Sequence, residues 1–412
     1  MHFDTIKKIA KFWHLVTPGR NIYMSFGTKF MEGIALLYLT LPELIMIFIS
    51  CLLLYLSIKK KYEPLLLLPI GFGMLMANLP MPEVLGLADL SAHSEGGLLY
   101  YLYQGIKLGI YPPLIFLCLG AITDFGPLIA RPSTWFIGLG GQLGIFTSFG
   151  LALLVSRTVG SIIPELNFTI QEAACIGIIG SSDGPTTLFT ARTLAEHILP
   201  TVGIAAYSYM ALVPIIQPPI MRLLTTPKER VIVMPEPKEV SQRQKIFFPI
   251  IVTLVSILLV PGSGTLIGML MMGNLIRESG VVDRYIETLR GAMLNVLTIM
   301  IGLCIGATAT ADRMLNVKTI VIILLGLLAF AGGTVGGILV AKFLNVLSGG
   351  KVNPLIGNSG VSAMPMAARV SQKVAQEYNP KNFLIMHAMG PILASTIGSA
   401  LVAGIFIALF SN

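Results

Sequence analysis

The stretch IGSSDGPTTLFTAR, residues 179–192, decides how this chain folds, because it places one acid inside an apolar segment. Between Glu172 and Arg192 lie 19 residues that carry a single charge, Asp183. A carboxylate at the centre of a membrane span costs about 2.5–3.5 kcal/mol on insertion scales, so it normally faces a water-filled site or a partner. The flanking glycines and Pro185 disfavour a continuous helix around it. The sequence therefore predicts a segment that is interrupted at membrane depth.

The composition indicates an all-α polytopic membrane protein. Of the 412 residues, 54% are hydrophobic and 12% are charged, whereas an ordinary soluble domain is about 45–50% apolar and about 25% charged. The surplus apolar surface must face lipid. The 42 glycines and 25 prolines fit this class, because membrane helices tolerate both.

The net charge of +8 does not indicate a nucleic-acid-binding protein. Basic residues stand in short runs beside apolar segments, such as Lys59 to Lys61, which is typical of cytoplasmic loops next to membrane spans. The four cysteines are scattered singly, and neither they nor the five histidines have the spacing of a transition-metal site.

The chain divides into two membrane halves. Residues 1–38 are mixed basic and aromatic, and we expect an interfacial arm. The polar stretch 226–245, called the linker below, carries five Lys or Arg and three Glu residues. It separates residues 39–225 from residues 246–412, and we expect it on the cytoplasmic side.

Ten apolar stretches are candidate spans, at about 20 residues per pass: residues 41–58, 64–80, 111–130, 134–156, 199–224, 246–261, 263–277, 290–310, 317–345 and 383–410. Two more segments, 170–195 and 353–372, are apolar but interrupted. The sequence thus predicts nine to twelve passes.

Three motifs recur across the linker in the same order, which predicts a duplicated fold. The matched pairs are Gly120–Asp124 with Gly306–Asp312, 138–150 with 332–344, and Ile179–Pro185 with Ile356–Ser362.

The first interrupted segment offers only oxygen ligands, from Ser181, Ser182, Asp183, Thr186, Thr187 and carbonyls that a helix break would free. Hard cations such as Na⁺ prefer oxygen, and transporters build midplane cation sites from broken helices. Alternatively, Asp183 caps a buried helix N-terminus. The two interpretations can both hold.

The second interrupted segment, residues 353–365, contains Asn353, Asn358 and Ser362. On a helix, Asn358 and Ser362 share one face, and Arg369 lies two turns further on that face. A guanidinium suits a carboxylate-bearing ligand. The alternatives are an arginine that snorkels to the interface and Asn and Ser residues that only join helices.

Two further groups lie within apolar surroundings. Tyr207 and Tyr209 are either packing residues or a proton donor. Asp124 can pair with Arg131, and we interpret both as structural.

Three motifs together resemble one family. SSDGPT with Asp183, AYSYMALVP with Tyr209, and NPLIGNSGVSAMPMAARVSQ from Asn353 are similar to the beta subunit of sodium-translocating biotin-dependent decarboxylases. That family couples decarboxylation of oxaloacetate, methylmalonyl-CoA or glutaconyl-CoA to sodium export. The resemblance runs from about residue 110 to the C-terminus.

The resemblance implies site residues at matching positions. The family's functional positions fall on Asp183, Tyr209, Asn353, Gly357, Ser362 and Arg369. We expect Na⁺ to be held by Asp183, Asn353, Ser182, Gly357 and Asn358. We expect Tyr209 and Ser362 to take part in ion or proton passage, and Arg369 to bind carboxybiotin.

The resemblance also implies the setting. It predicts a carboxybiotin decarboxylase and Na⁺ translocase of the bacterial inner membrane, which consumes a proton from outside. Its partners would be an alpha carboxyltransferase subunit, a biotin carrier protein and a small gamma or delta membrane subunit, and the chain would form a homo-oligomer. The implied fold has two inverted repeats with re-entrant hairpins, a scaffold and an elevator-like core. A sodium-coupled secondary carboxylate transporter, or a membrane scaffold without transport, stays open as an alternative.

Overall fold

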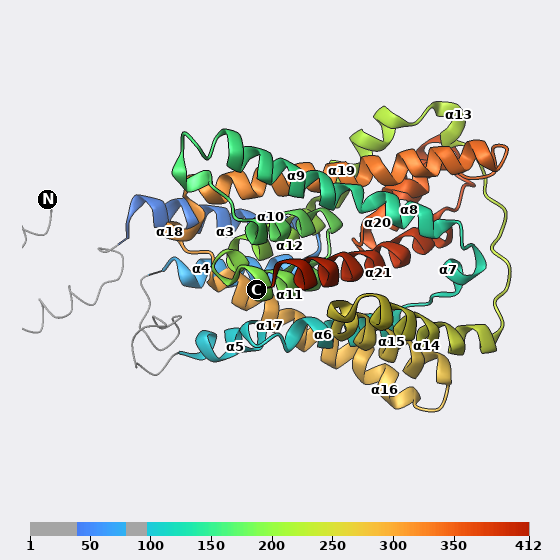
Figure 1. Cartoon of the computed structure of the whole chain (residues 1–412), viewed down its shortest axis with the longest axis horizontal. Helices are drawn as coiled ribbons and strands as arrows, with labels where there is room; N and C mark the ends of the chain where they lie inside the picture. Colours follow the sequence, from blue (N-terminus) through green and yellow to red (C-terminus); the bar gives the residue numbers. More distant parts are fainter. Residues whose placement is uncertain (1–38, 80–96, 412) are drawn as a thin grey trace, which may run out of the picture.

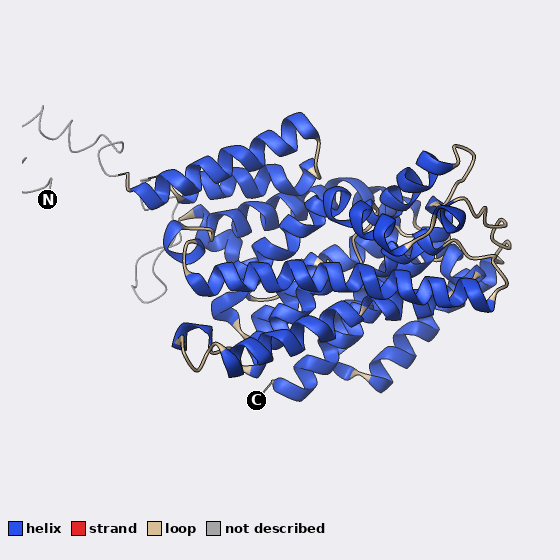
Figure 2. Cartoon of the chain, turned by 90° about the horizontal axis from the view of Figure 1, so that it is seen from above, coloured by secondary structure: helices blue, strands red, loops and turns tan. Residues whose placement is uncertain are grey.

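The computed structural model describes residues 39–79 and 97–411, and every regular element within them is helical (Figure 2). The predicted arm 1–38 lies outside the described residues. The first half contains α3 (Leu41–Lys60), α4 (Pro64–Ala77), α5 (Leu98–Lys107), α6 (Tyr111–Ile122), α7 (Gly126–Ala130), α8 (Thr134–Gly141), α9 (Leu143–Thr158), α10 (Ile170–Ile178), α11 (Gly184–Leu194) and α12 (Leu199–Leu224). After α13 (Pro227–Arg230), the second half contains α14 (Gln242–Leu259), α15 (Gly264–Ser279), α16 (Asp283–Thr288), α17 (Leu294–Ala307), α18 (Ala311–Met314), α19 (Val317–Leu347), α20 (Met366–Tyr378) and α21 (Ile385–Phe410).

The described residues contain six helices that are long and apolar enough to cross a membrane, which makes this a multi-pass membrane protein. The number is eight if α5 with α6 and the two parts of α12, bent by 70° and 63°, each count as one span. This is fewer than the nine to twelve passes predicted. Helices α4 and α15, with 14 and 16 residues, are shorter than the roughly 20 residues of a full span.

Two helix pairs are joined by reciprocal glycine contacts. Helix α4 packs on α17, and α6 packs on α15. At these crossings, a Cβ on any of four glycines would lie 1.9–2.3 Å from a carbonyl oxygen of the partner helix. The four are Gly73 and Gly306 in the first pair, and Gly120 and Gly273 in the second. Each pair joins one helix from each half of the chain, so the halves are interleaved.

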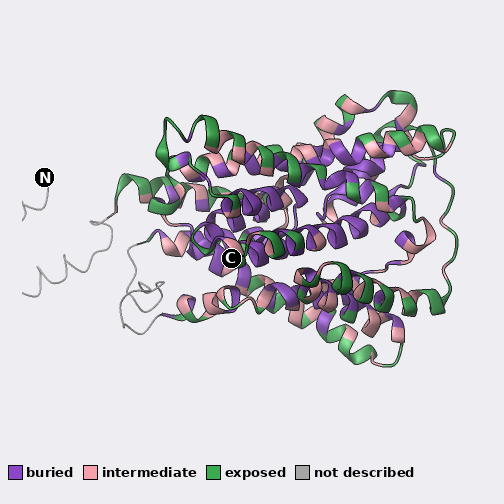
Figure 3. Cartoon of the chain, viewed as in Figure 1, coloured by how far each residue is buried: buried purple, intermediate pink, exposed green. Residues whose placement is uncertain are grey.

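The interior is formed by α10, α11, α12, α19 and α21, and Figure 3 shows the buried residues concentrated there. Of the apolar window of α21, 72% is buried, against 17% for α3 and 11% for α14. Helix α21 is therefore central, whereas α3 and α14 present apolar side chains to lipid.

Residues 170–198, called the first hairpin below, enter and leave at the same end of the molecule. Helix α10 ends in a short 3₁₀ turn, Ile179–Ser181, and Ser182 has a positive φ of 55° before α11 begins. The predicted interruption is present. At the mouth of this hairpin, the His197 ring is 2.7 Å from the Glu172 carboxylate.

Residues 353–382, called the second hairpin below, enter and leave at the linker. A 3₁₀ helix, Pro354–Gly360, leads inward and α20 leads back. The side-chain amides of Asn353 and Asn382 both donate to the carbonyls of Arg230 and Ile232 in the linker, at 2.8–3.3 Å. The predicted second interruption is therefore also present.

The two hairpins approach each other from opposite ends. Helices α7 and α13 mark the linker end, and α5 and α18 mark the other (Figure 1). The tips meet in the interior, where the Ser362 N–H donates to the Ser181 carbonyl at 2.8 Å. Helix α8 packs directly against the second tip here, and only glycine fits at position 141. A Cβ on Gly141 would lie 1.6 Å from the Gly360 oxygen.

The linker packs back on the helices around it. Lys245 pairs with Asp124 at 3.2 Å, and Arg131 donates instead to the Pro235 carbonyl. The suggested pairing of Asp124 with Arg131 is therefore wrong, because each side chain finds a different partner in the linker, Lys245 for Asp124 and the Pro235 carbonyl for Arg131. Burial by itself would raise the pKa of Asp124, but the Gly126 N–H and the Lys245 ammonium outweigh burial and lower it.

Candidate ion-binding site between the hairpin tips

Asp183 caps the N-terminus of α11. Its backbone is extended, and its Oδ1 accepts from the Thr186 N–H at 3.3 Å. Its side chain is buried, with 4% of the residue exposed. Within the described residues, no Lys, Arg or His nitrogen lies within 4.0 Å of its carboxylate. Capping is thus present, and the negative charge still has no protein counter-ion.

Helix α21 contributes a hydroxyl to this acid. The Ser399 Oγ donates to the Asp183 Oδ2 at 3.0 Å. One turn earlier on α21, Ser395 accepts from the Ser362 hydroxyl and from the Gln142 amide, both at 3.1 Å. Sequence reasoning missed Ser395, Ser399 and Gln142, although small polar residues at i and i+4 inside an apolar span were a usable signal.

Three hydroxyls around this acid have no hydrogen-bond partner in the described part of the chain. They are Ser182 Oγ, Thr186 Oγ1 and Tyr207 OH, and all three residues are buried. A buried polar atom without a partner costs about 1–3 kcal/mol. One uncompensated charge among neutral oxygens is the donor set that a small monovalent cation requires.

The two tyrosines predicted on α12 have different surroundings. The Tyr209 hydroxyl donates to the Ile323 carbonyl of α19. The Tyr207 ring lies over Gly184, the residue after Asp183, where an added Cβ would be 2.3 Å from the Tyr207 Cζ. The structure therefore places the Tyr207 ring against the residue that follows Asp183.

The second hairpin brings only Ser362 into this group. Asn353 makes its contacts at the linker, as described above. Asn358 donates to the Gln217 Oε1 at 2.9 Å, and the Gln217 amide donates back to the Asn358 carbonyl at 2.9 Å. Gly357 packs on the backbone of α19, where an added Cβ would be 2.4 Å from the Ile338 Cα. The roles of Asn353, Gly357 and Asn358 as Na⁺ ligands stay predictions.

Arg369 lies in the first turn of α20, just after the tip of the second hairpin. It is exposed on α20 and lines a cavity of about 450 Å³ with Gln372, Lys373, Gln376, Glu377 and Ile385. The Glu377 carboxylate is already paired with Arg222 at 2.7 Å. The charges of Arg369 and Lys373 thus remain available to an anionic ligand.

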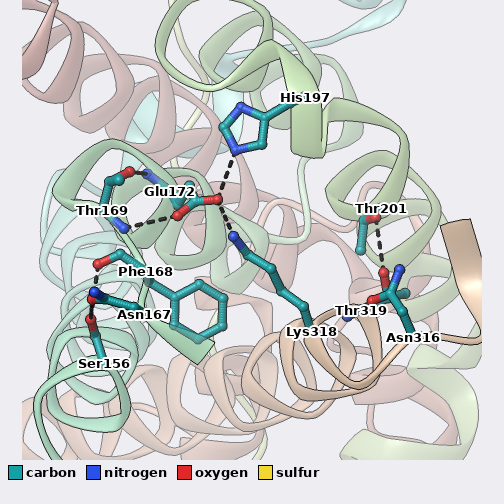
Figure 4. A network of polar contacts seen from close by, with 10 residues as sticks. All are labelled: Ser156, Asn167, Phe168, Thr169, Glu172, His197, Thr201, Asn316, Lys318 and Thr319. Atoms are coloured by element: carbon teal, nitrogen blue, oxygen red, sulfur yellow. Dashed lines mark hydrogen bonds and ion pairs between the residues drawn. The ribbon is translucent and has the colours of Figure 1, made fainter. Parts of the chain in front are cut away.

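An ionic cluster closes the mouth of the first hairpin at the opposite end (Figure 4). The buried Glu172 carboxylate accepts from Lys318 of α19 at 2.5 Å and lies 2.7 Å from His197. It also accepts from the Thr169 N–H at 2.8 Å in a capping box. We call Glu172, His197 and Lys318 the outer latch. His197 and Lys318 also line a cavity of about 1010 Å³.

Comparison with known proteins gives a consistent result over nearly the whole chain. Residues 42–410 match the family model of the Na⁺-transporting oxaloacetate decarboxylase beta subunit. The chain is 51% identical to the methylmalonyl-CoA decarboxylase subunit beta of Propionigenium modestum, over 90% of this chain and 96% of the relative. It is 46% identical to the glutaconyl-CoA decarboxylase subunit beta of Acidaminococcus fermentans, over 93% and 97%. It is 44% identical to the oxaloacetate decarboxylase beta chain of Klebsiella pneumoniae, over 92% and 97%.

Proposed function

Because this chain belongs to the family of Na⁺-transporting decarboxylase beta subunits, we propose that it decarboxylates carboxybiotin and couples the reaction to Na⁺ export. The observation that carries the proposal is the buried Asp183 carboxylate, which has no counter-ion in the described part of the chain and lies where two hairpins from opposite ends meet. A secondary carboxylate transporter would share this architecture, but the family membership favours the decarboxylase.

Na⁺ would be held at the tips of the two hairpins. Asp183 supplies the charge, and the Ser182 hydroxyl beside it has no hydrogen-bond partner among the residues that the structure describes. Asn353, Gly357 and Asn358 would complete or shape the site in another conformation of the second hairpin. In the conformation described here, their contacts with the linker, α19 and α12 hold that hairpin in place.

The helix packing supports an arrangement of two inverted repeats. The first hairpin opens opposite the linker and the second opens at the linker. If α4 corresponds to α15 and α6 corresponds to α17, the α4–α17 pair and the α15–α6 pair are equivalent. The glycine contacts in the two pairs therefore fit a pseudo-twofold relation between the halves. We propose that α3–α6 and α14–α17 form the scaffold, and that the hairpins, α12, α19 and α21 form the moving core of an elevator.

Carboxybiotin would bind along α20 of the second hairpin. The Arg369 guanidinium suits its carboxylate, and the adjacent cavity of about 450 Å³ is open at the surface of α20. In the reaction the N–C bond breaks, CO₂ leaves and the ring nitrogen gains a proton. Tyr209 and Ser362, which lie between the two ends in hydrogen-bonded positions, would serve passage of that proton or of the ion.

The proposed setting is the inner membrane of a bacterium, with the linker in the cytoplasm because its basic residues favour that side. The carboxylate would arrive from an alpha carboxyltransferase subunit on a biotin carrier protein. A small gamma or delta membrane subunit and further copies of this chain would complete the complex. Moving one charge against 100 mV costs about 2.3 kcal/mol, so a decarboxylation that releases several kcal/mol could export one or two Na⁺ ions.

The deciding experiment replaces Asp183 with Asn in proteoliposomes supplied with free carboxybiotin. The Asn side chain still caps α11, so the protein should insert and fold. Na⁺-stimulated CO₂ release should fall by about 100-fold or more, because a neutral amide does not offset a cation in a low-dielectric site. Wild-type Na⁺ stimulation in this variant would refute the ion site. Na⁺-coupled carboxylate uptake without any decarboxylation would favour the transporter instead.

A further inference from the structure

Tyr207 is placed to act at the ion site, although sequence reasoning gives it no role there. It lies on α12 with 2% of the residue exposed. The atom of its ring nearest to an added Gly184 Cβ is Cζ, at 2.3 Å, and Cζ carries the hydroxyl. Because Gly184 directly follows Asp183, the phenol oxygen lies against the tip of the first hairpin.

The Tyr207 hydroxyl is buried and has no hydrogen-bond partner among the described residues. Buried tyrosine hydroxyls normally find one. The two nearest residues along the hairpin backbone with the same property are Ser182 and Thr186. Three hydroxyls, two from the first hairpin and one from α12, therefore lie near the Asp183 carboxylate, and neither they nor the carboxylate's charge has a partner within the described ranges.

We propose that the Tyr207 hydroxyl is a ligand of the transported cation and helps to select which monovalent cation is bound. A hydroxyl has one donor and two lone pairs, so each of the three can coordinate a cation while its hydrogen points to a neighbouring acceptor. The Tyr207 ring is wedged against Gly184, which fixes the position of the oxygen. A fixed oxygen discriminates between ions by size, because cavity size and rigidity set cation selectivity.

Tyr209 differs from Tyr207 in its contacts. Its hydroxyl donates a hydrogen bond to the Ile323 carbonyl. Its ring packs on Gly326, where an added Cβ would lie 2.9 Å from the ring. Tyr209 therefore joins α12 to α19. This contact positions α12, and with it Tyr207, relative to the hairpin.

The inference rests on the proposed function, and the experiment separates the two. Tyr207→Phe keeps the ring and removes the oxygen. The half-saturating Na⁺ concentration for CO₂ release should rise about three- to tenfold, as for one lost hydrogen-bonding ligand. The preference for Na⁺ over Li⁺ should fall about threefold, since a site with fewer fixed oxygens discriminates less by size. Na⁺-dependent thermal stabilisation of the purified protein should weaken in parallel.

A purely structural role for Tyr207 would be seen in the stability of the protein and not in its Na⁺ binding. Because the hydroxyl has no partner among the described residues and its unpaired burial is destabilising, its removal should not lower the melting temperature measured without Na⁺. A lower melting temperature with unaltered Na⁺ affinity and unaltered Na⁺ to Li⁺ ratio would overturn the inference. Thr186→Val, which removes another unpaired hydroxyl, should lower Na⁺ affinity in the same direction.

Tyr111→Phe is the matched control. Tyr111 also lies over a glycine, where a Cβ on Gly105 would be 2.1 Å from its Cζ, but it belongs to α6. The half-saturating Na⁺ concentration of Tyr111→Phe should stay within about twofold of the wild-type value. If Asp183→Asn still binds Na⁺, the proposed function fails. If Asp183→Asn loses Na⁺ binding and Tyr207→Phe retains it with the same selectivity, only this inference fails.

Discussion

Asp183 combines two tasks that are usually separate. As a cap it satisfies a helix N–H that would otherwise be unpaired, which contributes about 1 kcal/mol. As a buried charge without a counter-ion it destabilises the empty site. The helix N-terminus at α11 offsets part of that cost, because its dipole favours a negative charge. The rest would be offset by a bound cation.

Arg369 allows a prediction that separates ligand binding from ion binding. Arg369→Ala should raise the KM for free carboxybiotin by about three- to tenfold, as expected for one partly exposed charge-assisted contact. The half-saturating Na⁺ concentration should change by less than about twofold, because Arg369 is exposed, faces the cavity along α20 and makes no ion pair with Asp183 among the described residues. Steady-state kinetics of CO₂ release, with each ligand varied in turn, measure both constants.

Arg369→Lys serves as its control. It retains the charge but loses the planar fork that binds a carboxylate with two hydrogen bonds. We expect an intermediate KM. Equal effects of Arg369→Ala on Na⁺ and on carboxybiotin would argue against the assigned role.

At the scale of elements, the two hairpins are closed by different chemistry. The outer latch is ionic, with the buried Glu172 between Lys318 and His197. The second hairpin is held by neutral amides, from Asn353 and Asn382 to linker carbonyls. An ionic latch loses more when one partner is neutralised, because the remaining charge stays partly buried.

Glu172→Gln should therefore open the first hairpin. Cys175 lies one turn further along α10 and is fully buried, so its rate of labelling by a small maleimide reports opening. In a background without the exposed Cys51, we expect the rate to rise at least about tenfold, since breaking a buried ion pair costs roughly 3–5 kcal/mol.

The matched control is Glu165→Gln, an exposed acid just before α10 that makes no ion pair among the described residues. Its labelling rate should equal that of the parent. If Cys175 in Glu172→Gln is labelled no faster than in the parent, the outer latch does not hold the first hairpin closed.

At the scale of the whole molecule, the pairs α4–α17 and α6–α15 interleave the two halves of the chain. Neither half can be removed without separating a helix from its glycine-matched partner. Both hairpin mouths are thereby fixed at opposite ends of one body, and the proposed ion site lies between them.

This arrangement makes a topological prediction. In a cysteine-free background, Lys238→Cys in the linker should react with a membrane-impermeant thiol reagent only from the cytoplasmic side. Arg157→Cys, at the far end of α9, should react only from outside. Both residues are exposed, so the side of reaction reflects orientation. Reaction of both cysteines from the same side would contradict the positions of the two ends.

The sequence alone predicted the features that depend on local physics. Charge depletion indicated a membrane protein, Gly and Pro around Asp183 indicated a broken helix, and the position of that acid before Pro185 indicated a cap. Each follows from the neighbours of a residue along the chain, and each is present in the structure.

Only the tertiary structure decided which side chains surround that acid. Ser399 meets Asp183 across 216 positions, and no local pattern in an apolar span tells which face of α21 turns inward. Likewise, helix packing alone gives the Tyr209 hydroxyl a carbonyl partner and leaves the Tyr207 hydroxyl with none among the described residues. The helical period fixes the angle between the side chains at positions 207 and 209. The rotation of α12 about its own axis, which decides what each side chain faces, is set by the helices that pack against it.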